Sequence, residues 1–173
     1  MRYITISTFE NQGIDNIVSK ANPLELICIE DSHAGLSALA QAALKLMTEQ
    51  KDTRILFCTT FLDVRKPSIM EALADGMKHF NFKFDDFKFR NPDNTIIYKP
   101  NNSILYLESL IPSRCDPDYV KLNSYRPDAV FFDQLIYIEP KAYEAARMRL
   151  RLNFQPRRKQ LLMATTGQGR EIQ

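Results

Sequence analysis

The feature that most constrains the fold of this chain is an alternation of short apolar runs with longer segments of helical spacing. Residues 24–29 (Leu-Glu-Leu-Ile-Cys-Ile) and 54–59 (Arg-Ile-Leu-Phe-Cys-Thr) have the length and composition of buried strands. Between them, residues 36–49 place apolar side chains three and four positions apart, which is typical of a helix with one buried face. Strands that alternate with helices form parallel sheets, so we predict an α/β protein.

Further along the chain the same pattern continues, with one interruption. Pro67 suits the first position of a second helix, because the N–H that proline lacks has no partner there. Residues 99–102 (Lys-Pro-Asn-Asn) have the composition of a hairpin turn. We therefore expect a three-layer fold with a mostly parallel sheet and one β-hairpin excursion. The further predicted elements are a helix at 67–80, the hairpin at 94–108, a strand at 129–133, a helix at about 140–151 and a strand at 160–166.

Composition and length narrow the class of protein. The 173 residues are 45% hydrophobic and 25% charged, which suits one globular domain over residues 1–173, with its core at about 10–170. Charged residues interrupt every apolar stretch well before the about 20 residues that a bilayer requires, so no membrane contact is expected. The three cysteines lie far apart and form no C-x-x-C pair, which argues against a zinc site and a disulfide framework. A reducing cytoplasm is the expected location.

Positive charge gathers toward the C-terminal end. Residues 147–173 hold seven basic residues and one acid, a local charge of +6, so residues 1–146 carry −4 of the total of +2. A basic end on an acidic body could meet nucleic acid or an acidic partner, although a solvated helix face and loop would have the same composition. The candidate contact residues are Arg147, Arg149, Arg151, Arg157, Arg158 and Lys159.

Polar or small residues follow three of the predicted parallel strands, at 30–35, 133–134 and 165–167. The carboxyl ends of parallel strands meet at one edge of a sheet, which is where ligands bind in open α/β folds. A glycine-containing loop between a strand and a helix can hold phosphate through its backbone N–H groups. A later strand that ends in Asp can hold magnesium. The pattern therefore predicts a phosphate site at this edge.

The loop at 30–37 departs from the strict Walker A motif, G-x-x-x-x-G-K-[ST]. Glu30 stands at the first glycine position and Leu36 at the lysine position. Taken alone, Gly35 also fits a helix entry for which Ser32 is the N-cap. His33 could touch a phosphate, or it could be a surface or capping residue.

The order and spacing of these segments resemble the ATPase domain of the large terminase subunit, the DNA-packaging motor of tailed bacteriophages. The resemblance covers about residues 10–170. The segments that carry it are Ser32-His33-Ala34-Gly35-Leu36-Ser37, Thr59-Thr60 with Arg65, Asn101-Asn102-Ser103-Ile104, Lys121-Leu122, Asp133-Gln134 and Thr165-Thr166-Gly167-Gln168-Gly169.

This resemblance implies the additional-strand (RecA-like) P-loop NTPase class and a role for each matched segment. Residues 32–37 would bind nucleotide, Ser37 and Asp133 would hold Mg²⁺, and Thr165 and Thr166 would couple the site to movement. ATP and Mg²⁺ are the implied cofactors if the site is competent, and otherwise none. The implied partners are the portal, the small terminase, double-stranded DNA and further copies in a ring.

Three departures from the family pattern concern catalysis. Leu36 replaces the lysine that neutralises the phosphates, Gln134 replaces the acid that polarises the attacking water, and Lys121 replaces a candidate arginine finger. We therefore expect ATP hydrolysis to be impaired or absent. A change of Glu to Gln is also one that experimenters make to trap nucleotide, but Leu36 and Glu30 together favour natural degeneration.

Other functions remain open at this stage. The chain could be a non-enzymatic binding or assembly protein on the same fold, meeting nucleic acid or protein through its basic end. A helicase core of the DEAD-box kind needs a second domain of similar size, for which 173 residues leave no room. A complete large terminase continues into a nuclease domain with clustered acids. None follows Gly169, so we expect a fragment or a stand-alone module without a nuclease domain.

Overall fold

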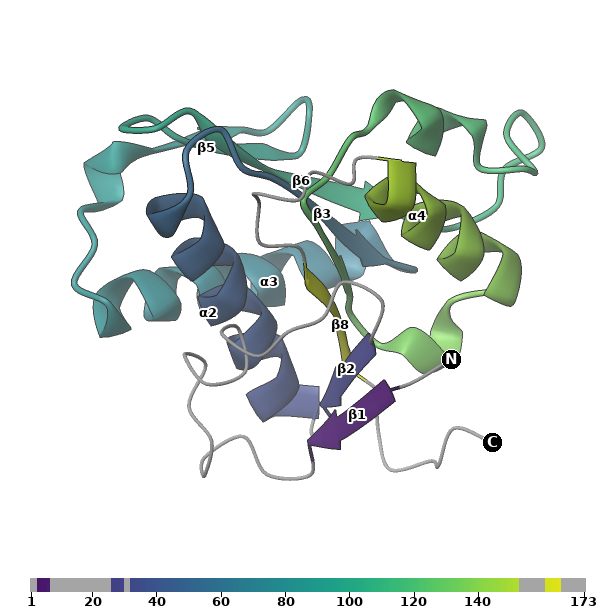
Figure 1. Cartoon of the computed structure of the whole chain (residues 1–173), viewed down its shortest axis with the longest axis horizontal. Helices are drawn as coiled ribbons and strands as arrows, with labels where there is room; N and C mark the ends of the chain where they lie inside the picture. Colours follow the sequence, from purple (N-terminus) through teal and green to yellow (C-terminus); the bar gives the residue numbers. More distant parts are fainter. Residues whose placement is uncertain (1–2, 7–25, 30–31, 153–160, 166–173) are drawn as a thin grey trace.

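In the computed structural model, the strands of the chain form one sheet with helices on both faces (Figure 1). The structure describes residues 3–6, 26–29, 32–152 and 161–165. The strands are β1 (Tyr3–Ile6), β2 (Leu26–Ile29), β3 (Arg54–Thr59), β4 (Phe87–Arg90), β5 (Thr95–Tyr98), β6 (Ser103–Ser109), β7 (Ala129–Phe132) and β8 (Leu161–Thr165). The helices are α2 (Ser32–Glu49), α3 (Leu62–His79) and α4 (Pro140–Leu152), with short 3-10 helices η2 (Phe84–Asp86), η3 (Val120–Ser124) and η4 (Leu135–Tyr137).

The strand order is β1-β2-β8-β7-β3-β6-β5-β4, and every pair from β1 to β6 is parallel. Strand β5 pairs antiparallel with both of its neighbours, β4 and β6, so among the described strands it alone runs opposite to the rest of the sheet. Strand β8 lies between β2, which comes before the predicted phosphate loop, and β7, which comes before Asp133. It is therefore the extra strand that gives the additional-strand class its name. The predicted α/β fold of the additional-strand class is confirmed.

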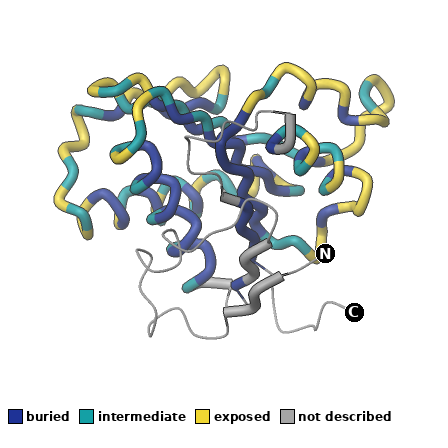
Figure 2. Tube along the Cα trace, in the orientation of Figure 1, coloured by how far each residue is buried: buried dark blue, intermediate teal, exposed yellow. Residues whose placement is uncertain are grey.

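The central strands are buried on both faces, as parallel strands between helix layers must be. Ile55 and Phe57 belong to the apolar cluster under α2 and α3, whereas Leu56 and Cys58 belong to the cluster under α4. Figure 2 shows this band of buried strands between the two helical layers. Among the described helices, none has both the length and the apolar character needed to cross a bilayer.

The start of α3 differs from the prediction. This helix begins at Leu62 rather than at Pro67, and the backbone N–H groups of Val64 and Arg65 donate to the carbonyl of Phe61. Proline inside a helix removes one hydrogen bond, here the one to the carbonyl of Asp63, and the five residues before Pro67 still form a helical turn. The earlier start carries Arg65 toward the carboxyl ends of the strands.

The hairpin is confirmed, but its second strand is not an excursion. Strands β5 and β6 pair around the turn at 99–102 as predicted, and β6 also pairs in parallel with the whole length of β3. The hairpin therefore extends the main sheet. Strands β1 and β4 were not predicted. Strand β4 alternates Phe87 and Phe89 with Lys88 and Arg90, which is a period-2 signal of an edge strand.

Candidate nucleotide site

The carboxyl ends of β7 and β8 meet through the side chain of Thr165. The register pairs Phe132 with Ala164, so Asp133 and Thr165 come next on neighbouring strands. The Thr165 hydroxyl donates to Asp133 Oδ1 at 3.3 Å, and it accepts the backbone N–H of Gln134 at an N···O distance of 2.7 Å. One buried hydroxyl therefore joins two of the segments that the sequence predicted to converge.

Helix α2 brings the third segment to the same point. A Cβ atom placed on Gly35 would lie 2.7 Å from Thr165 Cγ2 and 3.6 Å from Ile29 Cγ2. No side chain fits between α2 and the ends of β2 and β8, which is why glycine occupies this position. The sequence assigned Gly35 to a phosphate loop, and in the structure it also allows this close packing. Residues 30 and 31 lie outside the described residues.

The segment predicted to bind nucleotide lies in the first turns of α2. Leu36 is 7% exposed and belongs to the apolar cluster between α2, α3 and the sheet. Ala34 is half-buried, and the hydroxyl of Ser37 accepts a hydrogen bond from Gln41 Nε2 at 3.2 Å. Residues 34–40 contain no cationic side chain. Within the described part of the chain, a cation beside Asp133 must therefore come from an element other than the start of α2. Arg65 of α3 supplies it.

Arg65 of α3 holds Asp133 in a two-pronged ion pair. Arg65 Nε lies 2.7 Å from Asp133 Oδ2, and Arg65 Nη2 lies 3.2 Å from Oδ1. The Asp133 side chain is fully buried, whereas that of Arg65 is 22% exposed. The sequence pattern included Arg65 in a family motif without a role. The signal that could have found this contact is a lone arginine just after β3, the neighbour of the Asp-bearing strand.

As arranged, these residues do not fit a magnesium ion. Both carboxylate oxygens of Asp133 are engaged by Arg65, and a guanidinium at that distance repels a divalent cation. Within the described residues, no group of three or more His, Cys, Asp and Glu side chains gathers as a metal site would. The assignment of Ser37 and Asp133 to magnesium stays a prediction.

Gln134 and Lys121, predicted at degenerate catalytic positions, lie at the same edge of the sheet. Gln134 is half-buried and has left-handed backbone angles, φ 56° and ψ 60°. Lys121 of η3 is bound within its own chain, because its Nζ lies 3.3 Å from Glu108 Oε2 and donates to the carbonyl of Ser109 at 2.6 Å. A role for either residue in catalysis stays a prediction.

The basic C-terminal residues are only partly within the described chain. Arg147 on α4 pairs with Glu144, and Arg149 is half-buried with no hydrogen-bond partner for its Nε among the described residues. The inner face of α4 carries Ala142, Ala146 and Leu150. The predicted residues Arg157, Arg158, Lys159 and Thr166, and the side chains of Ser32, His33 and Arg151, lie outside the described part.

Comparison with known proteins then gives one consistent result. No protein-family model and no curated protein matches the chain. The solved large terminase of a thermophilic bacteriophage matches 91% of this chain with a TM-score of 0.63 and 12% identity. The chain has the fold of a large terminase. It covers 36% of that protein, about a third of its length.

Two further structures of the same phage terminase agree. In complex with ADP it matches 86% of this chain and 34% of its own (TM-score 0.61, 14% identity). In complex with ATP-gamma-S it matches 91% of this chain and 35% of its own (TM-score 0.60, 15% identity). At these identities the likeness establishes the fold, and it confirms the architecture that the sequence resemblance implied.

Proposed function

We propose that this chain is a terminase-like DNA-packaging module that binds nucleotide at the edge formed by β2, β8 and β7 and hydrolyses ATP poorly or not at all. Nucleotide binding is supported by the shared fold, since the terminase of the thermophilic phage has been solved with ADP and with ATP-gamma-S. The observation that carries the impaired activity is the ion pair between Arg65 and the buried Asp133.

The physical reason is the free-energy cost of separating Arg65 from Asp133. Breaking a buried ion pair by removing one partner typically costs about 3–5 kcal/mol, because the remaining charge is left uncompensated. A ligand that drew Arg65 away from Asp133 would have to offset a cost of this kind. The partly exposed guanidinium of Arg65 can instead meet a phosphate while it stays on Asp133, since it has five N–H donors. This arrangement favours binding without turnover.

The family resemblance supplies the biological setting of the proposal. The module would act beside the portal, the small terminase and double-stranded DNA in the host cytoplasm, and copies could assemble in a ring. Lys121 would face a neighbouring copy, Thr165 and Thr166 would transmit movement, and the basic stretch from Arg147 to Lys159 would contact DNA phosphates or a subunit.

The test is nucleotide binding and turnover for the wild type, two variants and a matched control variant. We expect ATP-gamma-S to stabilise the wild type equally with and without Mg²⁺, with phosphate release at the level of the buffer blank. Arg65→Gln with Gln134→Glu should make nucleotide binding depend on Mg²⁺. Adding Leu36→Lys should give measurable turnover if the buried site accepts the lysine. Arg65→Lys with Gln134→Glu is the matched control, because it keeps a cation beside Asp133.

Each result bears on a different part of the proposal. Hydrolysis by the wild type in Mg²⁺ would contradict the impaired activity. If neither the wild type nor the variant with Arg65→Gln and Gln134→Glu is stabilised by ATP-gamma-S, the nucleotide site itself is wrong. In that case the chain acts as a non-enzymatic binding or assembly protein. Arg65→Lys with Gln134→Glu keeps a cation beside the buried Asp133, so this variant reports on nucleotide binding even if Arg65→Gln or Leu36→Lys prevents folding.

A further inference from the structure

A second candidate site extends from the amino end of β3 along β6. A cavity of about 390 Å³ is lined by Arg54, Tyr106, Ser124, Tyr125 and Arg126. Arg54 is the first residue of β3, whereas the candidate nucleotide site lies beyond the last residues of the parallel strands. Tyr106 comes from β6, and the last three lining residues come from the end of η3 and the segment before β7. This cavity is therefore separate from the site built on Asp133.

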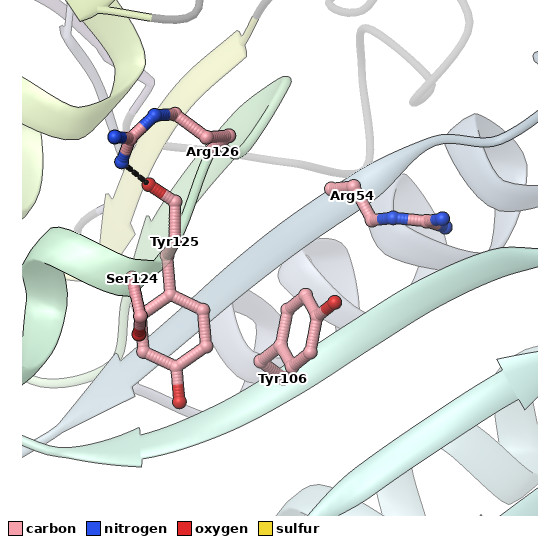
Figure 3. A pocket seen from close by; sticks show the side chains of 5 residues that line it. All are labelled: Arg54, Tyr106, Ser124, Tyr125 and Arg126. Atoms are coloured by element: carbon pink, nitrogen blue, oxygen red, sulfur yellow. Dashed lines mark hydrogen bonds between the residues drawn. The ribbon is translucent and has the colours of Figure 1, made fainter.

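One wall of the cavity is aromatic and held in place. The rings of Tyr106 and Tyr125 have centroids 5.0 Å apart and planes at 58°, and Figure 3 shows them side by side. The Tyr125 hydroxyl donates to Glu108, which is also the ion-pair partner of Lys121. Burial and this hydrogen bond raise the pKa of Tyr125 well above its usual range, so the ring stays neutral. The wall is a fixed and uncharged stacking surface.

Two arginines lie on either side of this ring pair (Figure 3). Arg54 Nη1 donates to the carbonyl of Asn102 at 2.6 Å. Arg126 Nη1 donates to the carbonyls of Asn123 and Tyr125 at 2.6 and 2.8 Å. The carbonyl of Asn102 carries no net charge, so this bond orients the Arg54 guanidinium and uses one of its five N–H donors.

Within the described chain, the residues that line the cavity include two cations and no carboxylate. Glu108 is bound by Tyr125 and Lys121, and the buried Asp128 accepts the backbone N–H of Arg54 at 3.0 Å. The cavity therefore combines a neutral aromatic wall with cationic side chains, which favours an anion that carries a planar ring.

We propose that this cavity binds a nucleoside phosphate, with the base stacked on the wall formed by Tyr106 and Tyr125 and the phosphate held by Arg54. Its volume lies within the about 300–1,000 Å³ usual for ligand pockets. Aromatic rings beside arginines are the combination that holds bases and phosphates of single strands. The nucleotide can come from solution or from a single-stranded nucleic acid, which share this chemistry. The proposal does not depend on the nucleotide site at the other edge.

The experiment is a calorimetric titration of the whole chain with AMP, with a six-residue oligothymidylate and with inorganic phosphate. The wild type should bind AMP or the oligonucleotide at least tenfold more tightly than phosphate. Tyr106→Leu should weaken binding by about tenfold or more, since stacking contributes about 1–3 kcal/mol per base. Tyr106→Phe keeps the ring and should bind as the wild type does. Tighter binding of AMP identifies a free nucleotide as ligand, and tighter binding of the oligonucleotide identifies a strand.

Variants of the charged groups separate this site from the one at the carboxyl edge. Arg54→Gln should weaken binding and reduce its dependence on salt, whereas the exposed Arg114→Gln, which does not line the cavity, is the matched control. Arg54→Gln should weaken AMP binding by the same factor in the wild type and in the Arg65→Gln background, because the two arginines belong to different sites. Equal affinity of Arg54→Gln, Tyr106→Leu and the wild type would overturn the proposal. So would AMP and oligonucleotide binding no tighter than phosphate.

Discussion

At the scale of single residues, Thr165 joins the three segments of the candidate site, and Gly35 is the residue that lets it do so. The methyl group of Thr165 lies where a side chain on Gly35 would be, and its hydroxyl is committed to Asp133 and Gln134. Thr165 cannot turn away without losing these bonds. We expect Gly35→Ala to lower the free energy of unfolding by about 1–3 kcal/mol, measured by urea denaturation.

A second substitution tests whether the Thr165 methyl group is the cause. Thr165→Ser removes Cγ2 and keeps the hydroxyl. In the Gly35→Ala background it should recover part of the loss, giving a coupling energy in a double-mutant cycle. Strictly additive effects of the two changes would contradict the packing described for α2.

Backbone conformation makes a separate prediction at Gln134. Its φ of 56° is left-handed, a region that costs an ordinary residue about 1–2 kcal/mol and costs glycine almost nothing. We expect Gln134→Gly to be more stable than Gln134→Ala by about 1 kcal/mol, measured by denaturation midpoints at equal slope. The reverse order would mean that residue 134 is not left-handed in solution.

At the scale of elements, Asn101 ties the hairpin to the end of α2. Its Nδ2 donates to the carbonyl of Met47 at 2.7 Å, and its Oδ1 accepts the N–H of Ser103 at 3.1 Å. The last carbonyls of a helix have no partner within the helix. Asn101→Ala should lower stability by about 1–3 kcal/mol, because buried polar groups lose their partners. Asn102→Gly is the matched control, since Asn102 is exposed with φ 63°, and equal losses would contradict the capping role.

Helix α3 offers a prediction about its unexpected start. If the helix begins at Leu62, Pro67→Ala restores an N–H to the carbonyl of Asp63 and removes a steric conflict. We expect the free energy of unfolding to rise by about 1–2 kcal/mol. Proline in a helix interior destabilises the folded state by about 3 kcal/mol, but it also restricts the unfolded chain, which offsets part of that loss. A loss of stability would instead indicate a helix that starts at Pro67, as the sequence pattern predicted.

These elements also show what sequence could and could not predict. The bounds of β3 and the turn at 99–102 follow from local signals, an apolar run and a Pro-Asn turn, and both were predicted as observed. The pair of Arg65 and Asp133 spans 68 positions and exists because β3 lies beside β7. Strand order of this kind has no local signal. The role of Arg65 was therefore missed, although Asp133 was named.

At the scale of the whole molecule, β3 lies inside a sheet that is covered on both faces, and Cys58 on this strand reports on global unfolding. The Cys58 thiol is fully buried and Cys115 is exposed. Burial raises the pKa of Cys58 well above its usual range, and only the thiolate reacts. We expect iodoacetamide to modify Cys115 at once and Cys58 only as the molecule unfolds, measured by mass spectrometry of the peptides.

The rate of Cys58 labelling also tests whether the two proposed ligand sites are separate. Any ligand that binds only the folded state lowers the population of unfolded molecules, so it slows the labelling of Cys58. A ligand at a concentration 100 times its dissociation constant raises the free energy of unfolding by about 2.7 kcal/mol, which lowers the population of the unfolded state about a hundredfold. ATP-gamma-S should slow Cys58 labelling in the Arg54→Gln variant, and AMP should slow it in the Arg65→Gln variant. If one substitution removed protection by both ligands, the two would share one site, and the separation of the two edges of the sheet would be wrong.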